Sequence, residues 1–209
     1  MSVYSDFIVL MDRGGPIMWV IFVVACVAMM MLAWQGLRLL QLIKHARRDY
    51  AYLLAQSGGS FDDDNRHSTS PVAQLLRVMN WDDINSKDDM AKEMNIHLAE
   101  LMPRLEGGLP TIATLGSLLP MLGLLGTVTG MINVFDVIAL KGSGNPDEMA
   151  HGISQALLTT ASGLIIAIPV IFMHHVLSRR LNVLMAITGQ AMQLVLHRDV
   201  AEFKRAEQS

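Results

Sequence analysis

Hydroxyl and amide side chains inside two apolar stretches are the groups of this chain that could do chemistry. The stretches cover about 109–140 and 152–177. Polar side chains within a membrane face a helix-bundle interior or a water-filled cavity, so these stretches are not expected to face lipid on every side. A hydroxyl both donates and accepts hydrogen bonds, and it can therefore order a water or pass a hydrogen-bonded proton without carrying charge. The polar residues include Thr111, Thr114, Ser117, Thr127, Thr129, Asn133 and Asp136 in the former stretch, and Ser154, Gln155, Thr159, Thr160 and Ser162 in the latter.

Catalysis, metal binding and nucleic-acid binding are not indicated. The sequence has no nucleophile–base pair and no cluster with metal-ligand spacing, and its single cysteine excludes a disulfide framework. His174 and His175 are neighbours that point about 100° apart on a helix, so one subunit cannot hold a metal with both. The net charge of −3, without a dominant basic stripe, argues against nucleic acid as a partner. We therefore expect no catalytic residues, no cofactor and no metal.

The composition is that of a membrane protein with a sizeable polar part. The 209 residues are 52% hydrophobic and only 17% charged, whereas soluble domains have about 25% charged residues. This balance excludes a disordered chain, which needs high charge and few apolar residues. The fold class that we predict is an all-α integral membrane protein.

Three stretches are long enough to cross a bilayer as helices. They cover 16–37, 109–140 and 152–177, and about 20 apolar residues are needed to span a hydrocarbon core of about 30 Å. A cleaved signal peptide is the alternative for the first stretch. We disfavour it because Asp6, Asp12 and Arg13 do not form a basic leading region and because the apolar run is long.

The distribution of positive charge predicts the orientation. All Lys and Arg residues except Arg13 and Lys141 lie at 38–104 or after 178. Since positive loops stay inside, the N-terminus is expected outside and the C-terminus inside. The outer segments are then 1–15 and 141–151, and the inner ones are a helical segment, 38–108, and a C-terminal helix, 178–209.

Within the inner segment, residues 57–70 are rich in Ser, Gly and Asp and are predicted to form a loop. Ser70 and Pro71 then have the residue types that begin a helix, with Ser as the N-cap. A second helix start is predicted near Ser86. From there an apolar pattern continues into the second span, so one helix could run from about 88 to 140. A bend is the alternative, at Pro103, Gly107, Gly108 or Pro110.

Small residues recur on one face of both polar-containing spans. Gly123, Gly126 and Gly130 do so in the second span, and Gly163 in the third. Such faces let helix backbones approach closely in lipid, which predicts helix packing at these positions. Packing within one subunit and packing between subunits both remain open.

Two motifs in these spans resemble those of the MotA/TolQ/ExbB proton channel family, and the chain looks most like a short ExbB. The first is G-L-L-G-T-V-x-G-M at 123–131, and the second is A-L-x-x-T-x-x-G-L-x-x-A-I-P at 156–169. The DRGGPIMW run at 12–19 resembles the opening of short ExbB proteins. The resemblance covers all three spans in the same order, about two-thirds of the chain.

The resemblance implies a function and partners. Members form an oligomer, expected to be a pentamer here, around a single-span partner of the ExbD or TolR kind that carries an intramembrane Asp. Proton flow through the bacterial inner membrane then drives the partner, which reaches a TonB- or TolA-like protein and powers transport across the outer membrane. The alternatives are a TolQ-like subunit of a Tol-Pal system and a scaffold that conducts no ions.

The resemblance also implies which residues line the ion path. Thr127 and Thr160 match the threonines that face the pore, and Thr159 is a weaker third candidate because it points about 100° away from Thr160. Hydrogen bonding to a carbonyl of the same helix is the alternative for each hydroxyl. Gln155 is the fourth candidate on the path, where its amide would orient water or the partner's Asp; many relatives carry Glu there, so this chain has no third-span carboxylate to carry a proton. The family pattern predicts that Gln155→Glu is tolerated.

Overall fold

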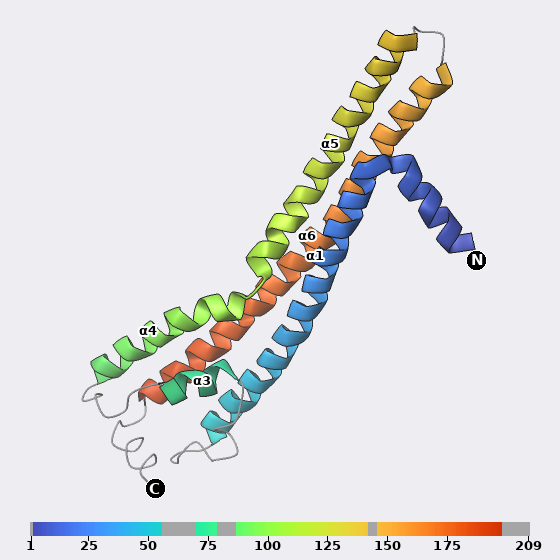
Figure 1. Cartoon of the computed structure of the whole chain (residues 1–209). Helices are drawn as coiled ribbons and strands as arrows, with labels where there is room; N and C mark the ends of the chain where they lie inside the picture. Colours follow the sequence, from blue (N-terminus) through green and yellow to red (C-terminus); the bar gives the residue numbers. More distant parts are fainter. Residues whose placement is uncertain (1, 56–69, 79–86, 142–145, 198–209) are drawn as a thin grey trace. The chain divides into compact units, whose positions relative to one another are not determined.

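The computed structural model describes residues 2–55, 70–78, 87–141 and 146–197, and this part of the chain is helical almost throughout. Its helices are shown in Figure 1. They are α1 (Ser2–Ala55), α3 (Pro71–Val78), α4 (Lys87–Glu106), α5 (Leu109–Lys141) and α6 (Pro146–His197). The predicted loop at 57–69, Ser86 and the residues after His197 lie outside the described ranges.

Three stretches of helix are long and apolar enough to cross a membrane. They run over Phe7–Leu54, Asp88–Leu140 and Pro146–Leu196. For the described residues, this confirms the prediction of a helical protein with three helices that are able to span a membrane. The orientation across the membrane remains a proposal.

α6 begins earlier and ends later than the third predicted span. α6 includes the predicted span, 152–177, and continues to His197 without a break. It also includes 146–151, a part of the predicted outer loop. Pro146 suits a first helical position, and Asp147 and Glu148 in the first turn are favoured by the positive end of the helix dipole.

α4 and α5 are separate helices, so the bend rather than the single continuous helix is found. The break lies at Gly107, whose φ of 52° is in the left-handed region that glycine adopts without a steric penalty. Two side chains of α1 bind the carbonyls that end α4. Gln35 donates to the Glu106 carbonyl at 2.9 Å, and Arg38 donates to the Arg104 carbonyl at 3.0 Å. These bonds satisfy acceptors that a helix end otherwise leaves unpaired.

α1 bends sharply at Gly15, which has φ 69° and ψ −166°. The sequence predicted only an outer segment over 1–15, but helix lies on both sides of the bend, as the N-terminal part of Figure 1 shows. Pro16 follows the bend and lacks the N–H that would continue the helical hydrogen bonds. We refer to residues 2–14 as the arm.

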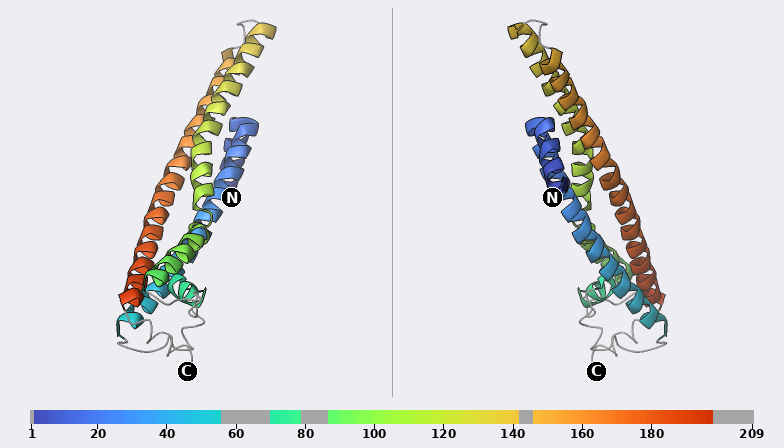
Figure 2. Two further views of the ribbon diagram at one scale, coloured as in Figure 1. Left: turned by 90° about the vertical axis from the view of Figure 1, so that its left-hand side faces the viewer. Right: turned by 90° about the vertical axis from the view of Figure 1, so that its right-hand side faces the viewer.

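The chain divides into two compact units. The first unit comprises Met1–Trp34 and Gly108–His175, and the second comprises Gln35–Gly107 and Val176–Ser209. Within the first unit, α5 and the N-terminal part of α6 lie side by side in both views of Figure 2. Within the second unit, α3 lies against α4. The predicted N-cap of α3 is confirmed, because the Ser70 hydroxyl accepts a hydrogen bond from the Ala73 N–H at 3.1 Å.

Candidate ion path

The contact between α5 and α6 is built from small residues of the two motifs. A Cβ on Gly123 would lie 3.0 Å from the Cα of Thr160, and one on Gly130 would lie 2.7 Å from the Cβ of Ala156. A Cβ on Gly126 would overlap the Thr159 hydroxyl. Each glycine therefore lies where a side chain would collide with the facing helix.

Gly163 supplies the same close approach from the side of α6. A Cβ there would lie 2.7 Å from the Leu119 carbonyl oxygen and 3.1 Å from the Cα of Gly123. Both obstacles are backbone atoms, which cannot move aside as a flexible side chain can. The geometry supports the proposed packing role of Gly123, Gly126, Gly130 and Gly163 within one subunit.

Thr160 joins the two motifs by a hydrogen bond. Its hydroxyl donates to the Gly123 carbonyl at 2.7 Å, although the two residues are far apart in the sequence. This is not the same-helix bond that was the alternative, because the acceptor belongs to the neighbouring helix, and a place on the ion path stays a prediction. The side chain is half-buried, and its oxygen still has lone-pair capacity to accept a bond.

Thr127 forms the bond within its own helix that the sequence left open as the alternative. Its hydroxyl donates to the Leu124 carbonyl at 2.7 Å. The side chain is half-buried, and the neighbouring Leu124 and Val128 are exposed in the isolated chain. The bond uses the hydroxyl proton and leaves the oxygen able to accept, so it is compatible with a place on the path.

Thr159 lies inside the helix contact. It is 1% exposed, and its hydroxyl donates to the Ala156 carbonyl at 2.8 Å, with the Gln155 carbonyl 3.3 Å away. Its position against Gly126 favours packing. Its membership of the ion path stays a prediction.

Gln155 is half-buried, and its amide nitrogen lies beside Gly15 at the bend of α1. No pattern in the sequence pointed to this neighbour, because the pattern of a helix shows which face is small or polar but not what covers it. The glycine pair before Pro16 was the available hint of an unusual backbone.

Other polar residues of these helices are satisfied locally or lie near the ends. Thr129 donates within its own helix to the carbonyls of Leu125 and Gly126. Asp136 is exposed near the end of α5. The rings of His174 and His175 stack edge to face, with centroids 5.5 Å apart. Among the residues that the structure describes, no three His, Cys, Asp or Glu side chains are grouped to hold a metal ion.

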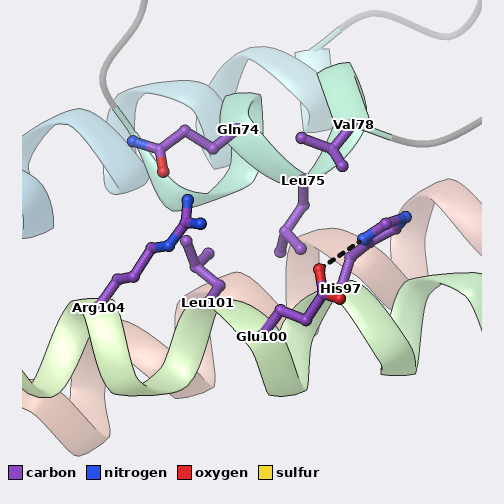
Figure 3. Close-up of a pocket in the computed structure, with 7 residues that line it drawn as sticks. All are labelled: Gln74, Leu75, Val78, His97, Glu100, Leu101 and Arg104. Atoms are coloured by element: carbon purple, nitrogen blue, oxygen red, sulfur yellow. Dashed lines mark hydrogen bonds and ion pairs between the residues drawn. The ribbon is translucent and has the colours of Figure 1, made fainter.

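The second unit has a small groove between α3 and α4, with a volume of about 200 Å³ (Figure 3). His97 lies at its edge, 3.2 Å from a Glu93 oxygen and 3.3 Å from a Glu100 oxygen. Arg104 and Gln74 supply the other polar groups, while the floor is apolar. The groove is lined by Gln74, Leu75, Val78, His97, Glu100, Leu101 and Arg104.

Comparison with known proteins gives a family and several relatives. A family model described as the MotA/TolQ/ExbB proton channel family matches residues 65–189. The Tol-Pal system protein TolQ of Pseudomonas aeruginosa is 30% identical over 161 residues, which are 73% of this chain and 70% of that protein.

Two transport proteins match over shorter segments. Biopolymer transport protein exbB1 of Vibrio cholerae is 40% identical over 101 residues, 48% of this chain and 42% of that protein. Biopolymer transport protein ExbB of Neisseria gonorrhoeae is 30% identical over 125 residues, 60% of this chain and 53% of that protein. The chain thus matches about half the length of these two relatives.

Proposed function

The chain belongs to the MotA/TolQ/ExbB proton channel family, and we propose that it is the proton-channel subunit of an inner-membrane complex that powers transport across the outer membrane. The family is one of channels and not of enzymes. Its helices make the chain a multi-pass membrane protein. The orientation with the N-terminus outside and the second unit in the cytoplasm is part of the proposal.

The observation that carries the proposal is the direct contact of the two motifs. The Thr160 hydroxyl donates to the Gly123 carbonyl, so the two motifs are fixed at the same depth of the spans. Thr127 lies about one helical turn from Gly123 on α5. The proposed path therefore brings both hydroxyls to one short segment, with Thr159 and Gln155 on the same helix as Thr160.

The hydrogen bonds indicate what these hydroxyls can do. The hydroxyls of Thr127 and Thr160 each donate their hydrogen bond to a backbone carbonyl. Their free capacity is therefore to accept, and an accepting oxygen stabilises a protonated carboxyl group or the O–H of a water. We propose that they hold the protonated form of the partner's intramembrane Asp, or a water that leads to it.

Uncovered apolar faces of one subunit support a proposed assembly. Leu124, Leu157, Ile165 and Phe172 are each more than half exposed in the isolated chain. We propose that α5 and α6 face a central pore and neighbouring subunits in a homo-pentamer, while α1 faces lipid. The partners are then an ExbD- or TolR-like single-span protein and a TonB- or TolA-like protein.

A TolQ-like role is a second candidate that has a specific observation in its favour. The match to the Tol-Pal protein of Pseudomonas aeruginosa covers 73% of this chain, against 48% for the Vibrio cholerae transport protein. The two roles share the proposed proton path and differ in the partner that the path drives. Restoring growth of strains that lack one system or the other distinguishes them.

Proton uptake into liposomes that contain the complex tests the proposal. Thr160→Val should lower partner-dependent uptake severalfold, because valine keeps the shape of threonine but has no oxygen to accept a bond. It should also remove the bond to Gly123, which contributes about 1 kcal/mol to stability. Thr160→Ser is the matched control, because serine keeps the hydroxyl and should keep most of the uptake.

Thr127→Val should lower uptake as well, whereas Thr129→Val serves as a second control on the same helix. Uptake that is unchanged in both Thr160→Val and Thr127→Val would exclude the hydroxyl path. Equal uptake with and without the partner would exclude the partner's Asp as the carrier. Absence of uptake in the intact complex would favour the non-conducting scaffold.

A further inference from the structure

A side chain of α6, Gln155, packs against the bend at Gly15. Gly15 has a backbone conformation that only glycine adopts readily, with φ 69°. A Cβ at this position would overlap the Gln155 amide nitrogen, so the space that glycine leaves empty is filled by that amide. Both residues belong to the first unit.

Gly15 also lies at the carboxyl end of the arm helix. The last carbonyls of a helix have no partner within it, and they form the negative end of the helix dipole. Pro16, which follows the bend, has no N–H to offer to one of them. An amide nitrogen that donates suits such a place, whereas a carboxylate would add negative charge next to carbonyl oxygens.

Further contacts keep the arm against the start of the long part of α1. The rings of Phe7 and Phe22 meet edge to face, with centroids 5.2 Å apart. Met11 on the arm and Met18 beyond the bend are buried. The arm is therefore a packed element, and the amide at its end has a defined position to hold.

We propose that Gln155 is the residue that seats the arm, by placing its amide nitrogen at the carboxyl end of the arm helix. Through this contact α6, which carries the motif threonines, holds the N-terminal arm in place. The contact requires an amide and is weakened by a carboxylate. It reverses the expectation from the family pattern that Gln155→Glu is tolerated. The inference does not depend on proton conduction.

Trypsin cleavage after Arg13 reports the position of the arm. Arg13 is exposed, precedes the bend by two residues, and is followed by no other Lys or Arg until Arg38, so cleavage releases a defined peptide of residues 1–13. The detergent-solubilised full-length protein, with its partner where the two copurify, is digested briefly, and this peptide is quantified by mass spectrometry.

Gln155→Glu should raise the rate of release about three- to tenfold, the change expected in a local opening equilibrium when a favourable contact with the negative end of a helix is replaced by a repulsive one. Gln155→Met, which keeps the length but cannot donate, should give a smaller increase. Gly15→Ala should release the arm as a positive control, since its Cβ overlaps the amide. Gly36→Ala is its matched control, because no atom lies within 4 Å of a Cβ there.

Gln190→Glu makes the same change on an exposed position of α6 and should leave release at the wild-type rate. Size-exclusion profiles identify any variant that has lost its fold. Wild-type release in a folded Gln155→Glu protein would overturn the proposal, as would an equal increase in Gln190→Glu. Proton uptake is measured on the same samples, so a change in arm release without a change in uptake separates this contact from the proposed path.

Discussion

The two units hold their helices together by different means. In the first unit, α5 and α6 meet through Gly123, Gly126 and Gly163, and the Thr160 hydroxyl bridges to a backbone carbonyl. The second unit is packed through large side chains such as Leu39, Met90 and Leu184, each at most 2% exposed, whereas the first unit adds its glycine contacts to buried large side chains such as Ile21 and Leu119. In lipid there is no hydrophobic driving force that brings apolar side chains together. Association of helices in a membrane therefore depends on close packing of their backbones. Water expels apolar groups, so large side chains stabilise helices there.

The difference supports the proposed division, with the first unit in the membrane and the second in water. The glycines of α5 would be a poor choice in water, because each glycine costs a helix about 1 kcal/mol relative to alanine. The carboxyl end of α4, bound by Gln35 and Arg38 of α1, belongs to the second unit. Three substitutions test this division, one in the first unit and two in the second.

Gly163→Val should have the largest effect. Its Cβ would lie 2.7 Å from the Leu119 carbonyl oxygen, and overpacking against atoms that cannot move destabilises by about 3 kcal/mol or more. We expect loss of a monodisperse peak in size-exclusion chromatography and a lower unfolding temperature in detergent. Gly36→Val is the control, with open space around its Cβ. An unaffected Gly163→Val protein would mean that α5 and α6 do not rely on close approach.

Leu184→Ala should cost about 2–5 kcal/mol, the range for removing a fully buried leucine from a packed core. Leu184 is 0% exposed, whereas Leu37, the control, is 64% exposed in the same unit. The measurement is the unfolding temperature of the purified protein. Equal shifts for Leu184→Ala and Leu37→Ala would contradict the view that the second unit is held by side-chain burial.

Ser70→Ala should cost about 1–3 kcal/mol. The Ser70 hydroxyl accepts from the Ala73 N–H and donates to the buried Asp49 carboxylate, so alanine removes both an N-cap and a donor to a buried charge. The unfolding temperature again measures the loss. Ser70→Thr retains the hydroxyl and should restore most of the stability, and failure to do so would mean that the size of the side chain matters more than its bonds.

The sequence was sufficient for the features that repeat along a helix. The three apolar spans follow from length and composition, and the N-cap at Ser70 follows from local residue types, because both depend on neighbours in the chain. The partner of a hydroxyl is a different matter. Thr127 and Thr160 have the same side chain and similar surroundings in the sequence, yet one binds its own helix and the other binds the facing one. That choice depends on how closely another backbone approaches, which no pattern within one helix records.

The break near Gly107 and the bend at Gly15 show the same limit. Near Gly107 the sequence left open a continuous helix or a bend, and over 1–15 it predicted an outer segment and no helical bend. At each place the structure shows a contact from another helix. Gln35 of α1 binds the end of α4, and Gln155 of α6 lies beside the bend at Gly15.

The two contacts of α1, at Gly15 and at Gln35, also constrain the length of the chain between them. They lie about 20 residues apart, or roughly 30 Å of helix, which equals the thickness of a bilayer's hydrocarbon core. One inserted or deleted residue would turn one contact by about 100° relative to the other. Substitutions are therefore expected at exposed positions of this segment, such as Val23, Met30 and Trp34, more often than gains or losses of residues.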